Sequence, residues 1–445
     1  MPASASASAP TPPYPTVWAA PVAPAAPRGL CTDCGISRTS EPKRCARACQ
    51  FIQPDYPKLE AQVHGRVRKT ASDTASVDGA EHASDEPWFG PIRRMLQASL
   101  VPARSGAQWS GITTRIAERL LETGAVDAVL TMAPDPTDNW RPMPVLVTSA
   151  EGMAQCRGMR MGYAPLLALL EPARARGFKR LAVIGIPCQV YALRALEKEF
   201  GFERLYVIGT PCSDNTTTEN FHQFLGLVAT QLKRRAQDIT YLEFRADYRV
   251  ELRFNDGRIK LIPFLQLPLS TLAPDFFPLT CRTCVDYTNV LADITVGYMA
   301  GQGEQWLLVR NERGEELVAL LGDELQTQPV GTAGKRHSAV KGFLANVQLA
   351  AGGLPLRRMP NWLRPIVGWL MPRIGPRGIE FAKARVEMKA AETVVHLRRE
   401  HPARIKNMVP AHVWPLVAPY GLVPAAGEQA DASPAPRAGV AEAPG

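Results

Sequence analysis

The chain has 445 residues, of which 46% are hydrophobic, and a formal net charge of +9 at pH 7. These values are ordinary for a globular protein with two or three domains, and the absence of any run of 18 apolar residues excludes a spanning helix. A basic protein favours acidic partners such as nucleic acid, an anionic membrane surface or an acidic electron carrier. The basic residues are dispersed and form no nucleic-acid-binding motif, so we expect no nucleic-acid partner.

Both ends of the chain are expected to be disordered. Residues 1–28 and 424–445 consist mainly of Ala, Ser, Pro and Gly and cannot bury enough apolar surface to offset chain entropy. The N-terminus has neither a charged n-region nor a long apolar h-region, so we predict no secretory signal and a cytoplasmic protein. Polar residues 66–86 are interpreted as a linker or surface loop.

The first set of four cysteines lies in an N-terminal segment that we place at residues 29–65. Its spacing is C-x2-C-x10-C-x3-C, formed by Cys31, Cys34, Cys45 and Cys49. Four thiolates can hold one zinc ion or one iron–sulfur cluster, and this spacing leaves both possibilities open. Disulfides are the weaker alternative, because they are rare in the cytosol.

Helices and strands alternate in the main body, which we place at residues 87–313. The apolar patterns predict helices at 111–124, 164–175, 189–200 and near 216–227, and strands at 125–132, 144–150, 180–186 and 204–210. This alternation predicts an α/β fold with a largely parallel sheet.

The pattern changes after residue 240. Residues 242–264 alternate with period two around Asn255-Asp256-Gly257, which predicts an antiparallel hairpin inserted into the α/β body. A further strand is predicted at 292–299. Residues 314–423 form a C-terminal helical segment in this scheme, closed by a basic helix at 377–400.

The second set of four cysteines is spread through the body. Cys188 and Cys212 each follow a proline at the end of an apolar run, and Cys281 and Cys284 form the pair CRTC. The carboxyl ends of neighbouring parallel strands meet at the edge of a sheet where ligands bind, so a closed four-thiolate site can form there. The alternative is inert cysteines in strand-to-helix turns, which is also our interpretation of the remaining Cys156.

The body resembles the beta-subunit family of deazaflavin-reducing hydrogenases and formate dehydrogenases. Within that family it is most similar to the ferredoxin-dependent branch that acts on chlorophyll precursors, which includes 8-vinyl reductases and 7-hydroxymethyl chlorophyll a reductases. The matching stretches include LCTDCG, QWSGITTRIAERLLETGAVDAV, GIPCQVYALRALE, LYVIGTPCSDN, CRTCVDYTNVLADITVGYM and VRNERG. They follow one another in the family's order from about residue 30 to residue 313.

The resemblance implies cofactors, a partner and a reaction. It implies two 4Fe–4S clusters on the two cysteine sets, FAD, and reduced ferredoxin as the electron donor. The implied reaction is reduction of the 8-vinyl group of divinyl (proto)chlorophyllide to ethyl in chlorophyll biosynthesis. The alternatives are a 7-hydroxymethyl chlorophyll or other tetrapyrrole substrate, or an electron-transfer subunit of a larger complex. The loop after Met299 is shorter than the family's, which weakens the assignment of the pigment.

For the FAD phosphates we expect a helix start with Ser110 as N-cap and Gly111 allowing close approach. Arg141 is a candidate for pairing with a phosphate or a substrate carboxylate, or a solvated loop arginine. The full set of expected FAD-binding residues is Ser110, Gly111, Thr113, Thr114, Arg141, Asn289 and Asp293. The alternatives are an ordinary capped helix and, for Asn289 and Asp293, loop capping.

The sequence identifies no proton donor. Asp286, Tyr287 and Tyr298 are candidates only because they lie near the expected flavin. The apolar stretch 362–371 is either a peripheral contact with a photosynthetic membrane or a core-packing segment, and we favour the core. A homo-oligomer remains open.

Overall fold

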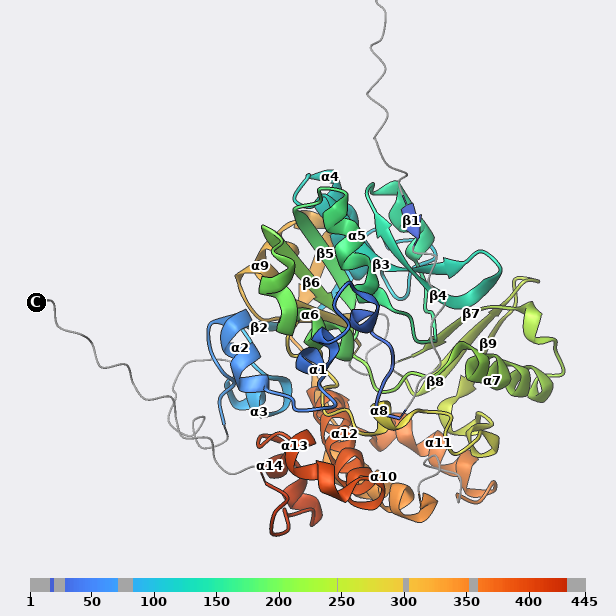
Figure 1. Ribbon diagram of the computed structural model, residues 1–445. Helices are drawn as coiled ribbons and strands as arrows, with labels where there is room; N and C mark the ends of the chain where they lie inside the picture. Colours follow the sequence, from blue (N-terminus) through green and yellow to red (C-terminus); the bar gives the residue numbers. More distant parts are fainter. Residues whose placement is uncertain are drawn as a thin grey trace, which may run out of the picture.

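The computed structural model describes residues 17–19, 29–70, 83–245, 247–298, 304–351 and 359–429 (Figure 1). A nine-stranded sheet forms the centre of the body, in the order β1-β4-β3-β5-β6-β10-β11-β2-β12. Its strands are β1 (Val17–Ala19), β2 (Arg94–Leu100), β3 (Ala128–Asp135), β4 (Asp138–Val147), β5 (Arg180–Gly185), β6 (Arg204–Gly209), β10 (Ile294–Gly297), β11 (Gln305–Val309) and β12 (Leu325–Gln328).

The central strands β3, β5, β6 and β10 are parallel. This confirms the predicted α/β fold with a parallel core. Antiparallel strands extend the sheet on both sides, with β4 and β1 beyond β3, and β11, β2 and β12 beyond β10. The sequence analysis did not anticipate the second extension, because its strands come from distant parts of the chain.

Helices cover both faces of the sheet. One face packs against α5 (Leu170–Ala175), α6 (Pro187–Phe200) and the N-terminal segment, and the other packs against α4 (Ile112–Glu122) and α9 (Glu312–Ala319). Pro187 fits the first turn of α6, where no N–H partner is needed, and Gly201 ends that helix in the left-handed conformation. The helix therefore starts directly after β5, which fixes the position of Cys188.

The predicted hairpin is confirmed as part of a separate three-stranded antiparallel sheet. Its strands are β7 (Ile239–Phe244), β8 (Arg249–Phe254) and β9 (Ile259–Pro263), in sequential order. Helix α7 (Thr218–Gln231) packs on this sheet through a cluster of apolar residues.

The C-terminal part of the chain is mainly helical. The long helix α12 (Ile379–Glu400) contacts α10 (Arg336–Ala350), α13 (Ile405–Met408) and α14 (Val413–Val417) below the body (Figure 1). The short strands β13 (Thr332–Ala333) and β14 (Arg377–Gly378) pair beside it. Short helices complete the N-terminal part and the second cysteine pair: α1 (Arg44–Ala48), α2 (Tyr56–His64), α3 (Glu86–Phe89) and α8 (Leu279–Arg282).

The expected tails and linker lie largely outside the described residues. Within the stretch 1–28, however, Val17–Ala19 form β1 and pair with β4, so a strand interrupts the expected tail. The predicted linker is anchored at both ends, because Arg66 donates to the Glu86 carboxylate at 2.7 Å and Arg68 donates to Glu60 at 2.8 Å.

Helix α11 (Leu363–Ile374) corrects our preference for a core-packing segment at 362–371. Trp362 is 70% exposed and Trp369 is 60% exposed. An apolar pattern shows that one face of a helix is apolar but not which side the protein covers. Among the described residues, no helix is long and apolar enough to cross a membrane.

Candidate redox site

The second cysteine set lies around the carboxyl edge of the parallel strands. Cys188 lies in the first turn of α6, directly after β5, and Cys212 follows β6. The two strand ends are neighbours, since the Thr210 N–H donates to the Gly185 carbonyl at 3.2 Å. Cys281 and Cys284 come from α8 and the turn after it. Burial, and then the other three thiols of the set, raise the pKa of Cys188 well above its usual value.

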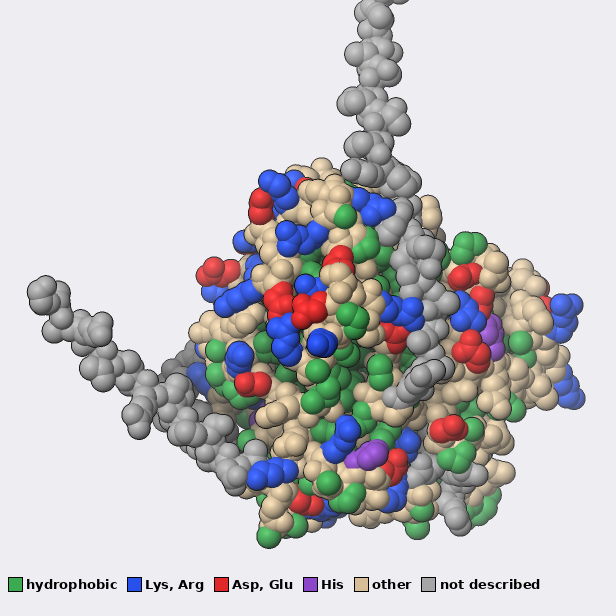
Figure 2. Space-filling view, in the orientation of Figure 1, with side chains coloured by type: hydrophobic (Ala, Val, Ile, Leu, Met, Phe, Trp, Pro, Cys, Tyr) green, Lys and Arg blue, Asp and Glu red, His purple; other side chains and the backbone are tan. Residues whose placement is uncertain are grey.

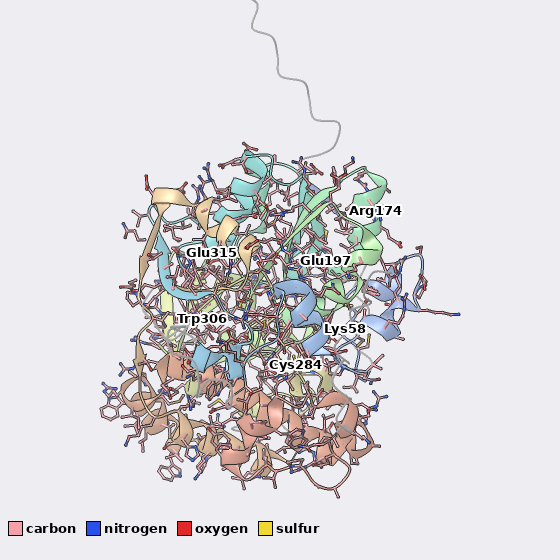
Figure 3. All side chains as sticks on the ribbon, turned by 90° about the vertical axis from the view of Figure 1, so that its left-hand side faces the viewer. Lys58, Arg174, Glu197, Cys284, Trp306 and Glu315 are labelled. Atoms are coloured by element: carbon pink, nitrogen blue, oxygen red, sulfur yellow. The ribbon has the colours of Figure 1, made fainter. Side chains whose placement is uncertain are left out.

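Helix α12 closes this site from the C-terminal side. The Lys389 ammonium donates to the Cys281 carbonyl, and the Thr393 hydroxyl donates to the Cys284 carbonyl at 3.2 Å. Figure 3 shows Cys284 in the interior, between the α/β body and the C-terminal helices. The second set is therefore enclosed by parts of the chain that are far apart in sequence.

Lys389 supplies a buried positive charge beside the second set. Its Nζ lies 3.0 Å from Asp214 Oδ1 and 3.4 Å from Glu392 Oε2. Burial alone lowers the pKa of this lysine, but the two carboxylates outweigh burial and raise it, so the ammonium form is retained. A cation at this position stabilises thiolate charge on Cys281 and Cys284.

Three hydrogen-bond donors point at sulfur atoms of the second set. The Tyr163 hydroxyl lies 3.2 Å from Cys281 Sγ, and the Asn215 N–H donates to the same sulfur at 3.3 Å. The Gln50 side-chain amide donates to Cys284 Sγ at 3.5 Å. Sulfurs that accept hydrogen bonds are suited to carrying thiolate charge, and Gln50 belongs to the N-terminal segment.

The first cysteine set lies next to the second. One pocket is lined by Cys31, Cys34, Cys45 and Cys49 together with Cys188. Cys31 is exposed, whereas all four cysteines of the second set are at least half-buried. The first set is thus the one nearer to solvent.

The surface around the first set carries charges of both signs. Arg44 and Arg47 pair with Glu171 and Glu199, at 2.7 and 2.9 Å, and Figure 2 shows acidic side chains beside basic ones on this face. The positive net charge of the protein is therefore not concentrated here.

All nine cysteines are free thiols. Burial is the main cause that raises the pKa of Cys34 and of Cys284 to about 12, and that of Cys49 to about 11. Thiols must lose their protons to bind metal, so occupation of either set releases protons. Cys156 is half-buried and has a pKa of about 12, raised by burial, which fits an inert cysteine.

The described residues contain no group of three or more His, Cys, Asp or Glu side chains spaced to hold a single metal ion. A tetrahedral zinc site would bring its cysteine sulfurs within about 3.8 Å of one another, because each Zn–S bond is about 2.3 Å. An iron–sulfur cluster holds its cysteines through different iron atoms and spaces them further apart. Four free thiols at each position are a donor set that suits either a zinc ion or an iron–sulfur cluster.

An aromatic wall lies beyond the second set, at the end of β10. We define it as Trp109, Tyr248, Tyr298 and Phe381. The ring centre of Tyr298 lies 5.3 Å from that of Trp109 and 5.8 Å from that of Phe381. The ring centres of Tyr248 and Phe381 are 5.8 Å apart. A Cβ built on Gly297 would come within 2.2 Å of Pro211 Cγ, so Gly297 packs directly against the residue before Cys212. Tyr298 of the wall is the next residue after Gly297.

The helix start expected to hold phosphate differs from the prediction. Gly111, not Ser110, is the N-cap of α4, with φ of 87°. Gln305 Oε1 accepts from the Ser110 hydroxyl at 2.9 Å and from the Ile112 N–H at 3.0 Å. One backbone N–H of the first turn is therefore already bonded to a side chain of β11. Thr113 and Thr114, the next residues of that turn, are half-buried.

Gly111 is required by the fold itself. A Cβ at this position would lie 2.8 Å from Arg104 Cβ and 2.9 Å from Ala107 Cβ, in a backbone conformation that side chains disfavour. Replacement of Gly111 would therefore strain the protein with or without a phosphate nearby.

The remaining expected FAD residues are engaged by other protein groups. The Asn289 amide donates to the Gly185 carbonyl at 2.8 Å, across the carboxyl ends of the strands. Asp293 is fully buried and accepts from Arg194 and Arg313, both at 2.8 Å. Arg141 lies 3.1 Å from the exposed Glu219. These contacts favour structural roles for the three side chains.

Several residues of the site carry no sequence signal. Lys389 lies on a helix with many other basic residues, so nothing in the sequence distinguishes it. Gln50 directly follows Cys49, and no pattern in the sequence marks it as a hydrogen-bond donor to the second set. Arg385, whose guanidinium lies 5.8 Å from the Tyr287 ring centre, also comes from α12. Regular spacing on α12 could have predicted a buried face, but not the element against which that face packs.

Family models match the chain in two consecutive parts. Residues 95–171 match the N-terminal part of the coenzyme F420 hydrogenase/dehydrogenase beta subunit, and residues 178–332 match its C-terminal part. The chain belongs to this family. This family consists of hydrogenase and dehydrogenase subunits, so the chain belongs to a class of oxidoreductase proteins.

Two relatives cover most of the chain. A protein of Nostoc sp. named as uncharacterized is 35% identical over 88% of this chain and 94% of its own length. The 7-hydroxymethyl chlorophyll a reductase of rice, Oryza sativa subsp. japonica, is 33% identical over 88% of this chain and 82% of its own length. A chain of the F420-reducing NiFe hydrogenase complex from Methanosarcina barkeri is 21% identical with a TM-score of 0.48, covering 55% of this chain and 84% of that one.

Proposed function

We propose that the protein is a ferredoxin-dependent reductase of a chlorophyll precursor, with two 4Fe–4S clusters and FAD. The substrate group is the 8-vinyl group of divinyl (proto)chlorophyllide, which is reduced to ethyl. Family membership supports an oxidoreductase role, and a relative named 7-hydroxymethyl chlorophyll a reductase supports a chlorophyll-type pigment.

One observation carries the proposal: the two cysteine sets and the aromatic wall follow one another in a row. The first set reaches the surface at Cys31, Cys188 joins it to the second set, and the Pro211–Gly297 contact joins the second set to the wall. The rings of the wall are inclined to one another by 48°, 40° and 76°. Two cysteine sets that lead from the surface to such a group of aromatic rings are suited to bringing electrons from an external donor to a planar ring system.

The proposed reaction consumes two electrons and two protons and forms two C–H bonds on the vinyl carbons. Two reduced ferredoxins supply the electrons, one each, and are oxidised. FAD, when bound, converts single electrons into a two-electron transfer. The eight cysteines would hold the clusters, and Trp109 and Tyr298 would orient a planar ring and exclude water.

Two further functions have support. Reduction of 7-hydroxymethyl chlorophyll is favoured by the relative that bears this name. Electron transfer within a larger hydrogenase or dehydrogenase complex is favoured by the family as a whole. We expect a cytoplasmic location, with peripheral contact to the membrane in which such apolar pigments reside.

The test is turnover by anaerobically purified protein with reduced ferredoxin. We expect conversion of divinyl protochlorophyllide to a product two mass units heavier, resolved by chromatography and mass spectrometry, and no conversion with NADPH alone. If the protein converts 7-hydroxymethyl chlorophyll but converts no divinyl pigment, the substrate is 7-hydroxymethyl chlorophyll. Turnover of neither pigment, in protein that contains both clusters and FAD, would contradict the reductase proposal.

A further inference from the structure

Helix α11 exposes an apolar face. Five of the twelve large apolar side chains that are exposed among the described residues lie between positions 362 and 374: Trp362, Ile366, Trp369, Leu370 and Ile374. Their spacing of 4, 3, 1 and 4 residues places them along one side of a helix. We call this set the α11 face.

The opposite side of α11 is anchored to the protein. A Cβ built on Gly368 would meet Pro263 and Leu265 at 3.7 and 3.8 Å, and Arg364 is buried. Figure 1 shows α11 at the outer edge of the molecule, below the three-stranded sheet. The helix is held firmly, and its apolar side faces outward.

The chemistry of the α11 face is that of a lipid-water boundary. Trp residues favour the headgroup level of a bilayer, and the face has two. Arg373 is exposed, with its guanidinium 4.0 Å from the Trp369 ring centre, and residues 362–374 include no Asp or Glu. A cation beside an aromatic ring, with no acidic side chain in the helix, is complementary to lipid phosphates.

We propose that the α11 face docks on a membrane surface that contains anionic phospholipids. The helix lies in the interface plane, with the five apolar side chains at the headgroup boundary and Arg373 at the phosphates. A second copy of the chain is less complementary, because in an isologous contact the same face of that copy offers no Asp or Glu within residues 362–374 to pair with Arg373. The inference rests on the membrane contact in the proposed function and identifies the surface that makes it.

The experiment is flotation of the full chain with phosphatidylcholine vesicles, with and without phosphatidylglycerol. We compare the native protein with the double variant Trp362→Ser/Trp369→Ser. Leu349→Ser/Val423→Ser is the matched control, because these side chains are also exposed, by 64% and 60%, but lie outside α11. The oligomeric state of each protein is measured by light scattering, and pigment turnover is measured in detergent.

We expect the native protein and the control to float with anionic vesicles, and binding of the α11 variant to fall at least about tenfold, since two large apolar groups no longer leave water. All three proteins should turn over detergent-dispersed pigment equally. Loss of membrane docking can therefore be distinguished from loss of catalysis. The proposal is overturned if the native protein does not float or if the variant floats as well as the control. It is also overturned if the native protein is an oligomer that the α11 variant dissociates, since the face is then covered by a second copy.

Discussion

The two cysteine sets bring four thiols together in different ways. The first set lies within nineteen consecutive residues, and its Cys31 is exposed. The second set joins two strand ends to the α8 turn and is closed by α12. The four cysteines of the first set are close together in sequence, whereas those of the second set meet only when distant parts of the chain have come together.

The difference extends to the charges around each set. Arg47, beside the first set, is 56% exposed and pairs with Glu199 at the surface. Lys389, beside the second set, is buried together with Glu392. Exposed pairs contribute little because water screens them, while removal of one member of a buried pair leaves an uncompensated charge.

Removal of a cysteine should have the largest effect and should separate the two sets. We expect Cys281→Ser to lose one cluster and retain the other, so that iron falls from about eight to about four atoms per chain, with pigment turnover abolished. Cys45→Ser should lose the opposite cluster. Iron and sulfide analysis with electron paramagnetic resonance measures both. Zinc in either set, or iron in neither, would contradict the assignment of clusters.

Loss of the buried cation should be the next largest effect. Lys389→Met removes the buried cation that pairs with Asp214 and Glu392, so we expect the free energy of unfolding to fall by about 3–5 kcal/mol. Arg47→Met should change it by no more than about 1 kcal/mol. Anaerobic guanidinium unfolding of both variants gives the comparison, and equal losses would refute the contrast between the two environments.

The hydrogen bond between the two sets should affect redox potential. Gln50→Leu removes the donor to Cys284 Sγ. A bond worth about 1 kcal/mol more on the reduced cluster corresponds to about 40 mV for one electron, so the potential of the second cluster should fall by about that amount. Gln53→Leu, at an exposed position nearby, is the control. A redox titration followed by electron paramagnetic resonance would show no difference between them if Gln50 has no influence.

The smallest effect should come from the exposed rim of the first set. Lys43 is exposed there, and we expect Lys43→Glu to raise the KM for ferredoxin about two- to fivefold at low salt, with kcat unchanged. The effect should vanish as salt screens the charge. Lys260→Glu, exposed on β9, is the control. An equal rise in both variants would mean that ferredoxin responds to net charge and not to this rim.

The sequence was sufficient wherever a feature is local. The apolar runs before Cys188 and Cys212 predicted two parallel strands and the edge where they end. The site predicted from the spacing of Cys31 to Cys49 stays a prediction. Both strands and their cysteines lie as expected.

The sequence was insufficient wherever a partner comes from afar. Asp293 could not be recognised as the acceptor for Arg194, because their pairing depends on how α6 crosses β10. Gln305 could not be recognised as the group that closes the start of α4, because β11 reaches that helix only in the folded sheet. Trp369 looked like core because apolar periodicity does not say which side is covered.

The contact between α12 and the second cysteine set has a consequence for how the protein matures. Residues 379–400 are synthesised after all four cysteines of that set. Lys389 and Thr393 then donate hydrogen bonds to the backbone carbonyls of two of these cysteines. The cluster proposed for this set would therefore have to be inserted before the helix docks, or the helix would have to open again to admit it. The proposed cluster of the first set does not depend on this order of events, because α12 does not close that set and Cys31 is exposed.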